Sequence, residues 1–245
     1  MKISVADKFN QSDVKEFWEN KLLDWEAGRY GLGNTDSAGG LLERIADKAS
    51  RSLRYRLQIC IELLGPHVSG KRVLELGCGS GFLAGAFMAA GATEYLGIDI
   101  SERALAVAKD RYVDNDWDGR LSFKAGTIQD FEAANHDIVL SLGLLDWLSD
   151  EELSALLDHQ GTLDFLHAIS EKRASLAQLI HRAYVYISYG HRSGAYVPRY
   201  FDSSSIAELS RQHRCAPVYV FRASELSFGA LLSSFPIGPQ IDPTK

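Results

Sequence analysis

Three closely spaced glycines, Gly77, Gly79 and Gly81, directly follow an apolar run and have the spacing of a ligand-binding loop. Glycine lets the backbone turn sharply and lets a ligand come within contact distance of the main chain, and a helix after the loop would add N–H donors. Asp99 stands 99 − 81 = 18 residues after the last glycine, at the end of the next apolar run. A carboxylate there can accept hydrogen bonds from both hydroxyls of a ribose. The pattern predicts a ribose-containing ligand, and NAD is one such ligand. The alternatives without a ligand are a tight turn for the glycines and a helix N-cap for Asp99.

From Lys71 onward, short apolar runs alternate with helical stretches. Strands are predicted at 72–76, 94–98, 121–124, 137–142, 162–169, 218–221 and 226–232. Helices are predicted at 82–90, 102–112, 128–132, 150–157, 176–189 and 204–213. This order predicts an α/β fold with a doubly wound, Rossmann-like sheet of seven strands whose last two form an antiparallel hairpin. Ligands bind to such sheets at the carboxyl ends of the strands, where the strand order reverses.

The first 66 residues have the pattern of helices rather than strands. Ser12 can cap one helix, and a second, continuous or broken, is expected roughly from Leu41 to Leu64, where Gly65 and Pro66 end it. We expect residues 1–66 to form a helical cap or lid and residues 67–245 to form the ligand-binding domain, the two packed as one unit.

The composition is that of a globular chain, with 245 residues, 46% of them hydrophobic and 24% charged. These values exclude a disordered or fibrous protein. The net charge of 26 − 32 = −6 argues against a partner nucleic acid. Cys60, Cys78 and Cys215 lack zinc-ligand spacing, and there is neither a signal-peptide core nor a run of 18 uncharged apolar residues. We therefore expect a cytoplasmic protein with no metal and no membrane partner.

The glycine motif, extended to Glu75 before it and to Gly97-Ile98-Asp99-Ile100-Ser101 after it, resembles class I S-adenosylmethionine-dependent methyltransferases. The order of elements from about residue 71 to residue 232, including the final hairpin, is similar as well. The resemblance implies S-adenosyl-L-methionine as cofactor, S-adenosyl-L-homocysteine as product, and methyl transfer as the reaction.

The same resemblance implies a role for each matching residue. The glycine loop, including Cys78, would approach the amino-acid end and ribose of the cofactor, and Glu75 would support the loop and the cofactor's ammonium group. Asp99 would hold the ribose hydroxyls. The remaining positions that the resemblance assigns to the cofactor are Ile100, Thr127 and Ile128 at the adenine and Leu142 at the methionine part.

Residues 25–31, residues 170–173 with the helix after them, and the loop through Pro198 resemble magnesium-protoporphyrin O-methyltransferases. They also look like methyltransferases of polysaccharide and natural-product gene clusters. In the porphyrin enzymes, a tyrosine that matches Tyr30 and a histidine after the fourth strand are thought to act in the site. This chain has Asp146 and Trp147 in place of that histidine, so we use this resemblance for the architecture and do not expect porphyrin methylation.

Methyl transfer to a hydroxyl needs in-line alignment and a base, whereas a carboxylate acceptor needs no base. Asp146 is a candidate base or orienting group, or else a loop hydrogen-bonding partner. His191, in a glycine-flanked loop, is a second candidate base, or else a solvated histidine. Tyr30 is expected in a lid that excludes water, or else in a hinge between helices. Trp147 would stack on the acceptor, or else serve as a core aromatic.

The basic residues Arg173 and Arg192 favour an anionic acceptor such as a phosphate, a carboxylate or a nucleotide-linked sugar. The sequence thus predicts a methyltransferase that acts on an oxygen of a small molecule. Two alternatives stay open: a cofactor-binding interaction module without activity, and an NAD-dependent oxidoreductase, which the GxGxG spacing and the hairpin disfavour. The sequence identifies neither the acceptor nor the oligomeric state.

Overall fold

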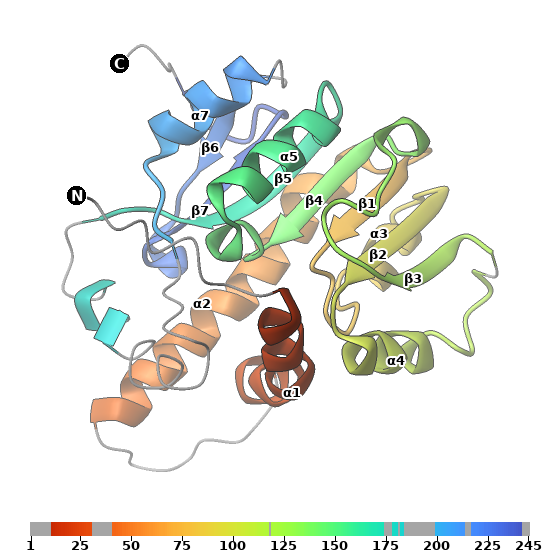
Figure 1. The fold of residues 1–245 in the computed structure, drawn as a ribbon, viewed down its shortest axis with the longest axis horizontal. Helices are drawn as coiled ribbons and strands as arrows, with labels where there is room; N and C mark the ends of the chain where they lie inside the picture. Colours follow the sequence, from red (N-terminus) through yellow and green to blue (C-terminus); the bar gives the residue numbers. More distant parts are fainter. Residues whose placement is uncertain are drawn as a thin grey trace.

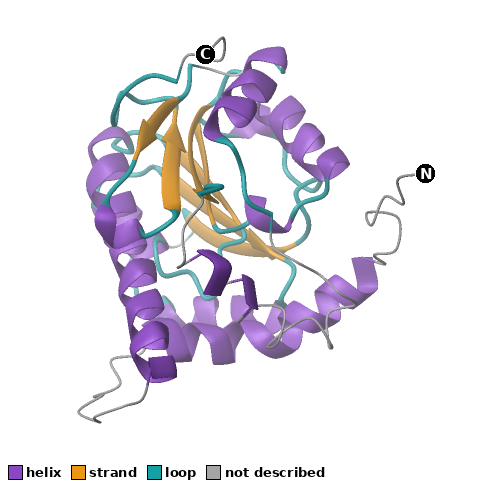
Figure 2. Ribbon diagram, turned by 90° about the vertical axis from the view of Figure 1, so that its left-hand side faces the viewer, coloured by secondary structure: helices purple, strands orange, loops and turns teal. Residues whose placement is uncertain are grey.

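The computed structural model describes residues 11–30, 41–117, 119–173, 178–180, 182–183, 199–213 and 217–241, without the side chains of 11–14, 25, 28–30 and 41–49. Within these residues the chain forms one seven-stranded sheet with helices on both of its faces (Figures 1 and 2). No helix in the described part is long and apolar enough to cross a membrane.

The sheet has the strand order β3-β2-β1-β4-β5-β7-β6. Its strands are β1 (Arg72–Leu76), β2 (Glu94–Asp99), β3 (Leu121–Ala125), β4 (Ile138–Leu142), β5 (Asp164–Ser170), β6 (Tyr219–Phe221) and β7 (Gly229–Ser233). The first five are parallel to one another, and β7 pairs antiparallel with both β5 and β6. The strand order reverses between β1 and β4, so a ligand site is expected at the carboxyl ends of these two strands. The predicted doubly wound sheet with its antiparallel hairpin is confirmed.

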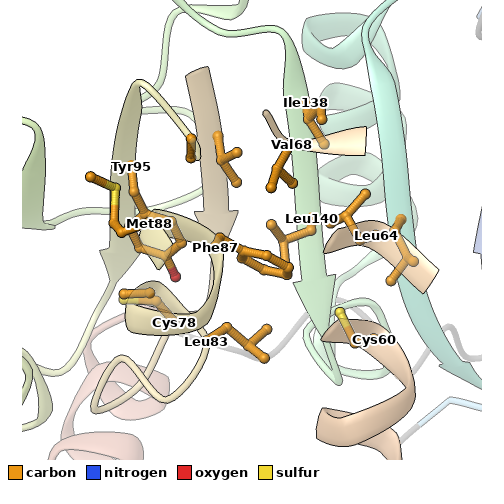
Figure 3. Packing of buried hydrophobic residues seen from close by; sticks show 14 of the residues in the cluster. Cys60, Leu64, Val68, Cys78, Leu83, Phe87, Met88, Tyr95, Ile138 and Leu140 are labelled. Carbon is orange, nitrogen blue, oxygen red and sulfur yellow. The ribbon is translucent and has the colours of Figure 1, made fainter. Parts of the chain in front are cut away.

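The helices are α1 (Gln11–Tyr30), α2 (Leu41–Leu64), α3 (Ala84–Ala89), α4 (Glu102–Arg111), α5 (Asp150–Gln160) and α7 (Ser203–Gln212). Successive residues of a strand point to opposite faces, so β4 divides its side chains between two cores. Ile138 and Leu140 face α2, α3 and α4, while Val139 faces α5 and α7. Figure 3 shows the first of these cores, in which Cys60 and Leu64 of α2 pack near Leu140. The C-terminal half of α2 is therefore part of the sheet's core; the division of the chain at residue 66 stays a prediction.

Several predicted bounds shift by one to three residues, and two differences have an identifiable cause. The short helix expected at 128–132 is absent, because the Asp130 carboxylate accepts hydrogen bonds from the N–H and hydroxyl of Thr127 (2.6 and 2.8 Å) and holds a turn. A 3-10 helix, η3 (Ala133–Asn135), follows it. The last strand begins at Gly229 rather than at 226, because the 3-10 helix η5 (Ser224–Leu226) and Ser227, whose φ is +58°, turn the chain first. Most of the helix predicted at 176–189 lies outside the described residues.

Candidate cofactor site

The glycine loop leaves β1 at the point where the strand order reverses. Gly79 and Gly81 adopt φ values of +53° and +71°, which favour glycine. A Cβ at Gly81 would lie 2.9 Å from the ring of Phe123, so the loop packs too closely on β3 for a side chain there. The Cys78 side chain is buried in the core (Figure 3), and its thiol donates to the Gly79 backbone oxygen (3.7 Å). Burial raises the pKa of this thiol well above the usual value. Only the backbone of Cys78 is therefore available to a ligand.

Asp99, at the end of β2, joins this loop to the start of α4. Its Oδ2 accepts a hydrogen bond from the Gly79 N–H (2.8 Å), and its Oδ1 accepts one from the Ser101 N–H (2.9 Å). The carboxyl is buried, and burial raises its pKa although these N–H groups oppose the shift. A carboxylate can accept about four hydrogen bonds, so Asp99 keeps capacity for hydroxyl donors of a ligand. This geometry suits the ribose predicted from the sequence.

Glu75, whose support of the loop stays a prediction, lies inside the sheet. It is buried on β1, where its carboxylate accepts a hydrogen bond from the Tyr95 hydroxyl. Burial, reinforced by the charges of Asp99 and Glu26, raises its pKa to about 8. A group with this pKa is mostly protonated at neutral pH, and a nearby cation, such as an ammonium group, would favour its ionised form.

The other predicted cofactor residues lie at the same edge of the sheet. Ile100 follows β2 and Leu142 ends β4, both partly buried, and Ile128 is buried beyond β3. The Gly126 N–H donates to the Asp99 backbone oxygen (3.0 Å), which brings the turn that contains Thr127 beside the end of β2. The structure thus brings all the cofactor positions predicted from the sequence to the carboxyl ends of β1 to β4.

Two charged residues at this edge were missed in the sequence analysis. Glu26 of α1 accepts a hydrogen bond from the Ser80 N–H of the glycine loop (3.0 Å). Arg56 of α2 lies beside Gly143, where a Cβ would be 3.1 Å from its Nη1. The Arg56 Nε is buried and has no hydrogen-bond partner among the described residues. Burial of a guanidinium nitrogen without a hydrogen-bond partner costs free energy. The place beside Arg56 and Gly143 therefore fits an anionic group of a ligand.

One of these residues left a signal in the sequence. Arg56 is in helical register with Cys60 and Leu64, at i, i+4 and i+8, and both of these are fully buried. A cationic residue on the same helix face as two core residues indicates that its charged group is buried. Glu26 has a similar register, four and eight residues after Leu22 and Trp18, but its contact with the loop depends on how α1 docks.

Asp146 lies in a 3-10 helix, η4 (Leu145–Trp147), after β4. It is buried; its Oδ1 accepts from the Ser170 N–H (2.9 Å) and its Oδ2 from the Ser170 hydroxyl (2.8 Å). Burial raises the pKa of Asp146. The carboxylate therefore links the ends of β4 and β5, which is the loop hydrogen-bonding role that the sequence left open. Its role as a base stays a prediction.

Trp147 contacts α1 through an edge-to-face arrangement with Trp18, at 4.8 Å between ring centroids. Arg173 pairs with Glu171 (2.8 Å) and donates to the Ser227 backbone oxygen (2.8 Å), so its guanidinium already has a structural task at the end of β5. Its role toward the acceptor stays a prediction.

Three predicted residues have no described side chain in the structure. His191 and Arg192 lie outside the described residues. Tyr30 is the last residue of α1, and its side chain is not described. Their roles stay predictions.

Residues 73–161 match the family model for the methyltransferase domain. Over 72 residues the chain is 40% identical to the ribosomal protein L11 methyltransferase of Deinococcus radiodurans, a match that covers 29% of this chain and 26% of that protein. Over 128 residues it is 30% identical to the ubiquinone biosynthesis O-methyltransferase of Actinobacillus pleuropneumoniae, covering 47% and 53% of the two chains. The matches thus span about a quarter of the first relative and about half of the second.

Among solved structures, the fold is similar to magnesium protoporphyrin IX methyltransferase from Synechocystis PCC 6803 with bound SAH. The TM-score is 0.67 at 17% identity, and the match covers 91% of this chain and 98% of that one. The same enzyme has also been crystallised with bound SAM.

The sheet, the glycine loop at its switch point and the acid at the end of β2 define a nucleoside-binding α/β domain. Together with the match over residues 73–161, they show that this chain contains a class I S-adenosylmethionine-dependent methyltransferase domain.

Proposed function

We propose that this chain transfers the methyl group of S-adenosylmethionine to an oxygen of a small anionic molecule. The observation that carries the proposal is the Asp99 carboxylate, which is fixed by the Gly79 and Ser101 N–H groups at the switch point of the sheet. When bound, the cofactor supplies a methyl group on a positively charged sulfur.

The cofactor's polar groups have matching partners in the chain. Asp99 would accept hydrogen bonds from the ribose hydroxyls, and Glu75, in its ionised form, would favour the ammonium group. Arg56 would bind the carboxylate, because its unpartnered Nε lies at the end of β4 beside Gly143, next to the position that the resemblance assigns to the methionine part. A guanidinium suits a carboxylate because its N–H donors are held in a planar fork.

The acceptor would approach from the side of β4 and β5. Trp147 contributes an aromatic surface there, and the ring of Tyr200 lies under the guanidinium of Arg182 (4.9 Å). Burial raises the pKa of Tyr200 to about 12, with the charge of Arg182 opposing the shift and that of Asp146 adding to it. The neighbouring Arg199 N–H donates to the Asp146 backbone oxygen (2.9 Å), which brings this segment beside Asp146. The guanidinium of Arg182 on this side of the sheet supports an anionic acceptor.

The described carboxylates near this side, Asp146 and Glu171, are both engaged by hydrogen bonds from the chain. A carboxylate acceptor, which needs no base, is consistent with that arrangement. A hydroxyl acceptor would instead need a group such as the predicted His191 as its base.

The test uses S-adenosylmethionine labelled in its methyl group, the full chain, and a cell extract separated by ultrafiltration into small molecules and proteins. We expect label in the small-molecule fraction with the wild-type chain and none with Asp99→Ala. Loss of that label in mild alkali would identify a methyl ester and therefore a carboxylate acceptor. Label confined to the protein fraction would overturn the small-molecule acceptor, and no transfer to either fraction would overturn the activity.

A further inference from the structure

The backbone N–H groups of the glycine loop can be accounted for one by one. Those of Gly77 and Cys78 donate to the Ile98 oxygen (2.8 and 3.2 Å), and that of Gly81 donates to the Cys78 oxygen (3.0 Å). The Gly79 N–H donates to Asp99. The acceptors of these four N–H groups all belong to the loop itself or to β2, so the N–H groups are satisfied by the nucleotide-binding unit alone.

The fifth N–H, that of Ser80, has a partner from outside this unit. It donates to Oε1 of Glu26, 54 residues earlier in the chain, at 3.0 Å. Without α1, Ser80 would present a free N–H to whatever approaches the loop. In the structure, the Glu26 carboxylate accepts the hydrogen bond from this N–H.

Glu26 also fills the space that Gly79 leaves open. A Cβ at Gly79 would lie 2.2 Å from the Glu26 Oε1 and 3.8 Å from Cδ2 of Leu22. Glu26 and Leu22 are both buried. A glycine in this loop serves to bring a ligand against the main chain, yet here a side chain of the same protein occupies that place.

The polar contacts that join α1 to α4 are exposed. Lys15 pairs with Glu102 of α4 (2.9 Å), with about half or more of each side chain exposed, and such exposed pairs contribute little. The Arg103 N–H donates to the Glu19 carboxylate at the same junction (3.1 Å). Figure 1 shows α1 beside α4 at this end of the sheet.

Burial disfavours the charged form of the Glu26 carboxyl group. The pKa of Glu26 is raised by burial and by the charge of Asp99, against the hydrogen bond from Ser80 and the charge of Arg111. A carboxylate that is held near another carboxylate is easier to displace than one paired with a cation.

We propose that α1 competes with the cofactor from within the same chain, and we call it the strap. In the strap, Glu26 occupies the ligand position at Gly79 and Ser80, and the cofactor binds after Glu26 has left. The inference rests on the proposed cofactor site and adds to it an intramolecular competitor. The measured affinity is then the intrinsic affinity reduced by the fraction of molecules in which the strap is open.

The test measures the affinity of S-adenosylhomocysteine by calorimetry for the wild-type chain, Glu26→Ala and Glu26→Gln. Alanine removes the competitor, and we expect binding that is about tenfold tighter, which corresponds to about 1.4 kcal/mol. Glutamine keeps a hydrogen-bond acceptor at the same position, so Glu26→Gln should retain competition and bind less tightly than Glu26→Ala. Glu16→Gln, on an exposed position of the same helix, is the matched control and should bind like the wild type.

Hydrogen exchange gives a second readout that does not depend on affinity. In the ligand-free chain, the Ser80 amide should exchange at least about tenfold faster in Glu26→Ala than in the wild type, because its protecting acceptor has gone. In the wild type, S-adenosylhomocysteine should speed exchange in α1, because the strap is displaced.

Weaker binding by Glu26→Ala would mean that Glu26 contacts the ligand directly, and unchanged binding would mean that it does not compete; either result overturns the strap. Both results differ from failure of the proposed function, in which neither the wild type nor any variant binds S-adenosylhomocysteine, and the strap falls with it.

Discussion

Replacement of Asp146 separates a structural from a chemical role for this buried carboxylate. In Asp146→Asn, the amide oxygen can still accept from the Ser170 N–H, and the amide nitrogen can donate to the Ser170 hydroxyl, which turns to accept. The variant loses charge assistance, but it also removes a carboxylate whose pKa burial has raised. We expect these effects to nearly cancel, leaving the free energy of unfolding within about 1 kcal/mol of the wild type.

Asp146→Ala, in contrast, removes both acceptors and leaves the Ser170 N–H without a partner. Hydrogen bonds to charged groups contribute about 1.5–3 kcal/mol each, so we expect a loss of about 3 kcal/mol. For a chain of this length this corresponds to a fall of about 6–12 °C in the melting temperature.

The assay combines thermal unfolding with methyl transfer from labelled S-adenosylmethionine to the extract fraction. If the role is structural, Asp146→Asn should keep its melting temperature within about 4 °C of the wild type. Its turnover should stay within about threefold of the wild type. A catalytic base contributes about 100-fold or more. A variant with unchanged melting temperature whose turnover falls by that factor would refute the structural interpretation and make Asp146 the base.

Three further predictions concern other parts of the fold. Gly97→Ala would place a Cβ 2.7 Å from both the Cys78 Sγ and the Phe123 ring; such overpacking should cost about 1–3 kcal/mol, seen as a lower denaturation midpoint, and an unchanged midpoint would contradict this packing. Glu75 has its pKa raised to about 8 from 4.5, so the wild type loses stability as the pH rises through that interval, and the melting temperature of Glu75→Gln should increase relative to the wild type from about pH 5 to about pH 8; a constant difference would argue against the shift. Glu171 has its pKa lowered to about 2 from 4.5 by its arginine and serine partners, so its stabilising effect is present above about pH 4.5 and is lost toward about pH 2. The deficit of Glu171→Gln at neutral pH should narrow over that range, and a deficit that persists at the acid end would refute the charge-based explanation.

Most of the fold could be predicted from the sequence, because the apolar runs and the glycines reflect local constraints. The bounds of β1 were predicted to the residue, and the approximate extent of α2, which Gly65 and Pro66 end, was predicted as well, although α2 is one unbroken helix. The helix expected at 128–132 was wrong because periodicity does not register a side chain such as Asp130 that binds its own backbone. The start of β7 was placed too early because an apolar run does not show where a 3-10 turn interrupts it.

The site could be predicted only where it lies on the strands and their loops. Gly79 and Asp99 come together because adjacent parallel strands end at the same edge, which the element order already implies. Glu26 could not be found in this way, since its place depends on the docking of a helix from far along the chain. Arg173 shows the converse, since a cation expected to face a substrate is paired with Glu171.

The most direct test of the central claim is a thermal-shift titration with S-adenosylmethionine, S-adenosylhomocysteine and NADH, repeated on Asp99→Ala. At about 100 times its Kd a ligand stabilises the folded chain by about 2.7 kcal/mol, which corresponds to roughly 5–10 °C here. We predict this shift with both sulfur compounds, none with NADH, and its loss in the variant. A shift with NADH alone would contradict the assignment and make the chain a nicotinamide-binding protein.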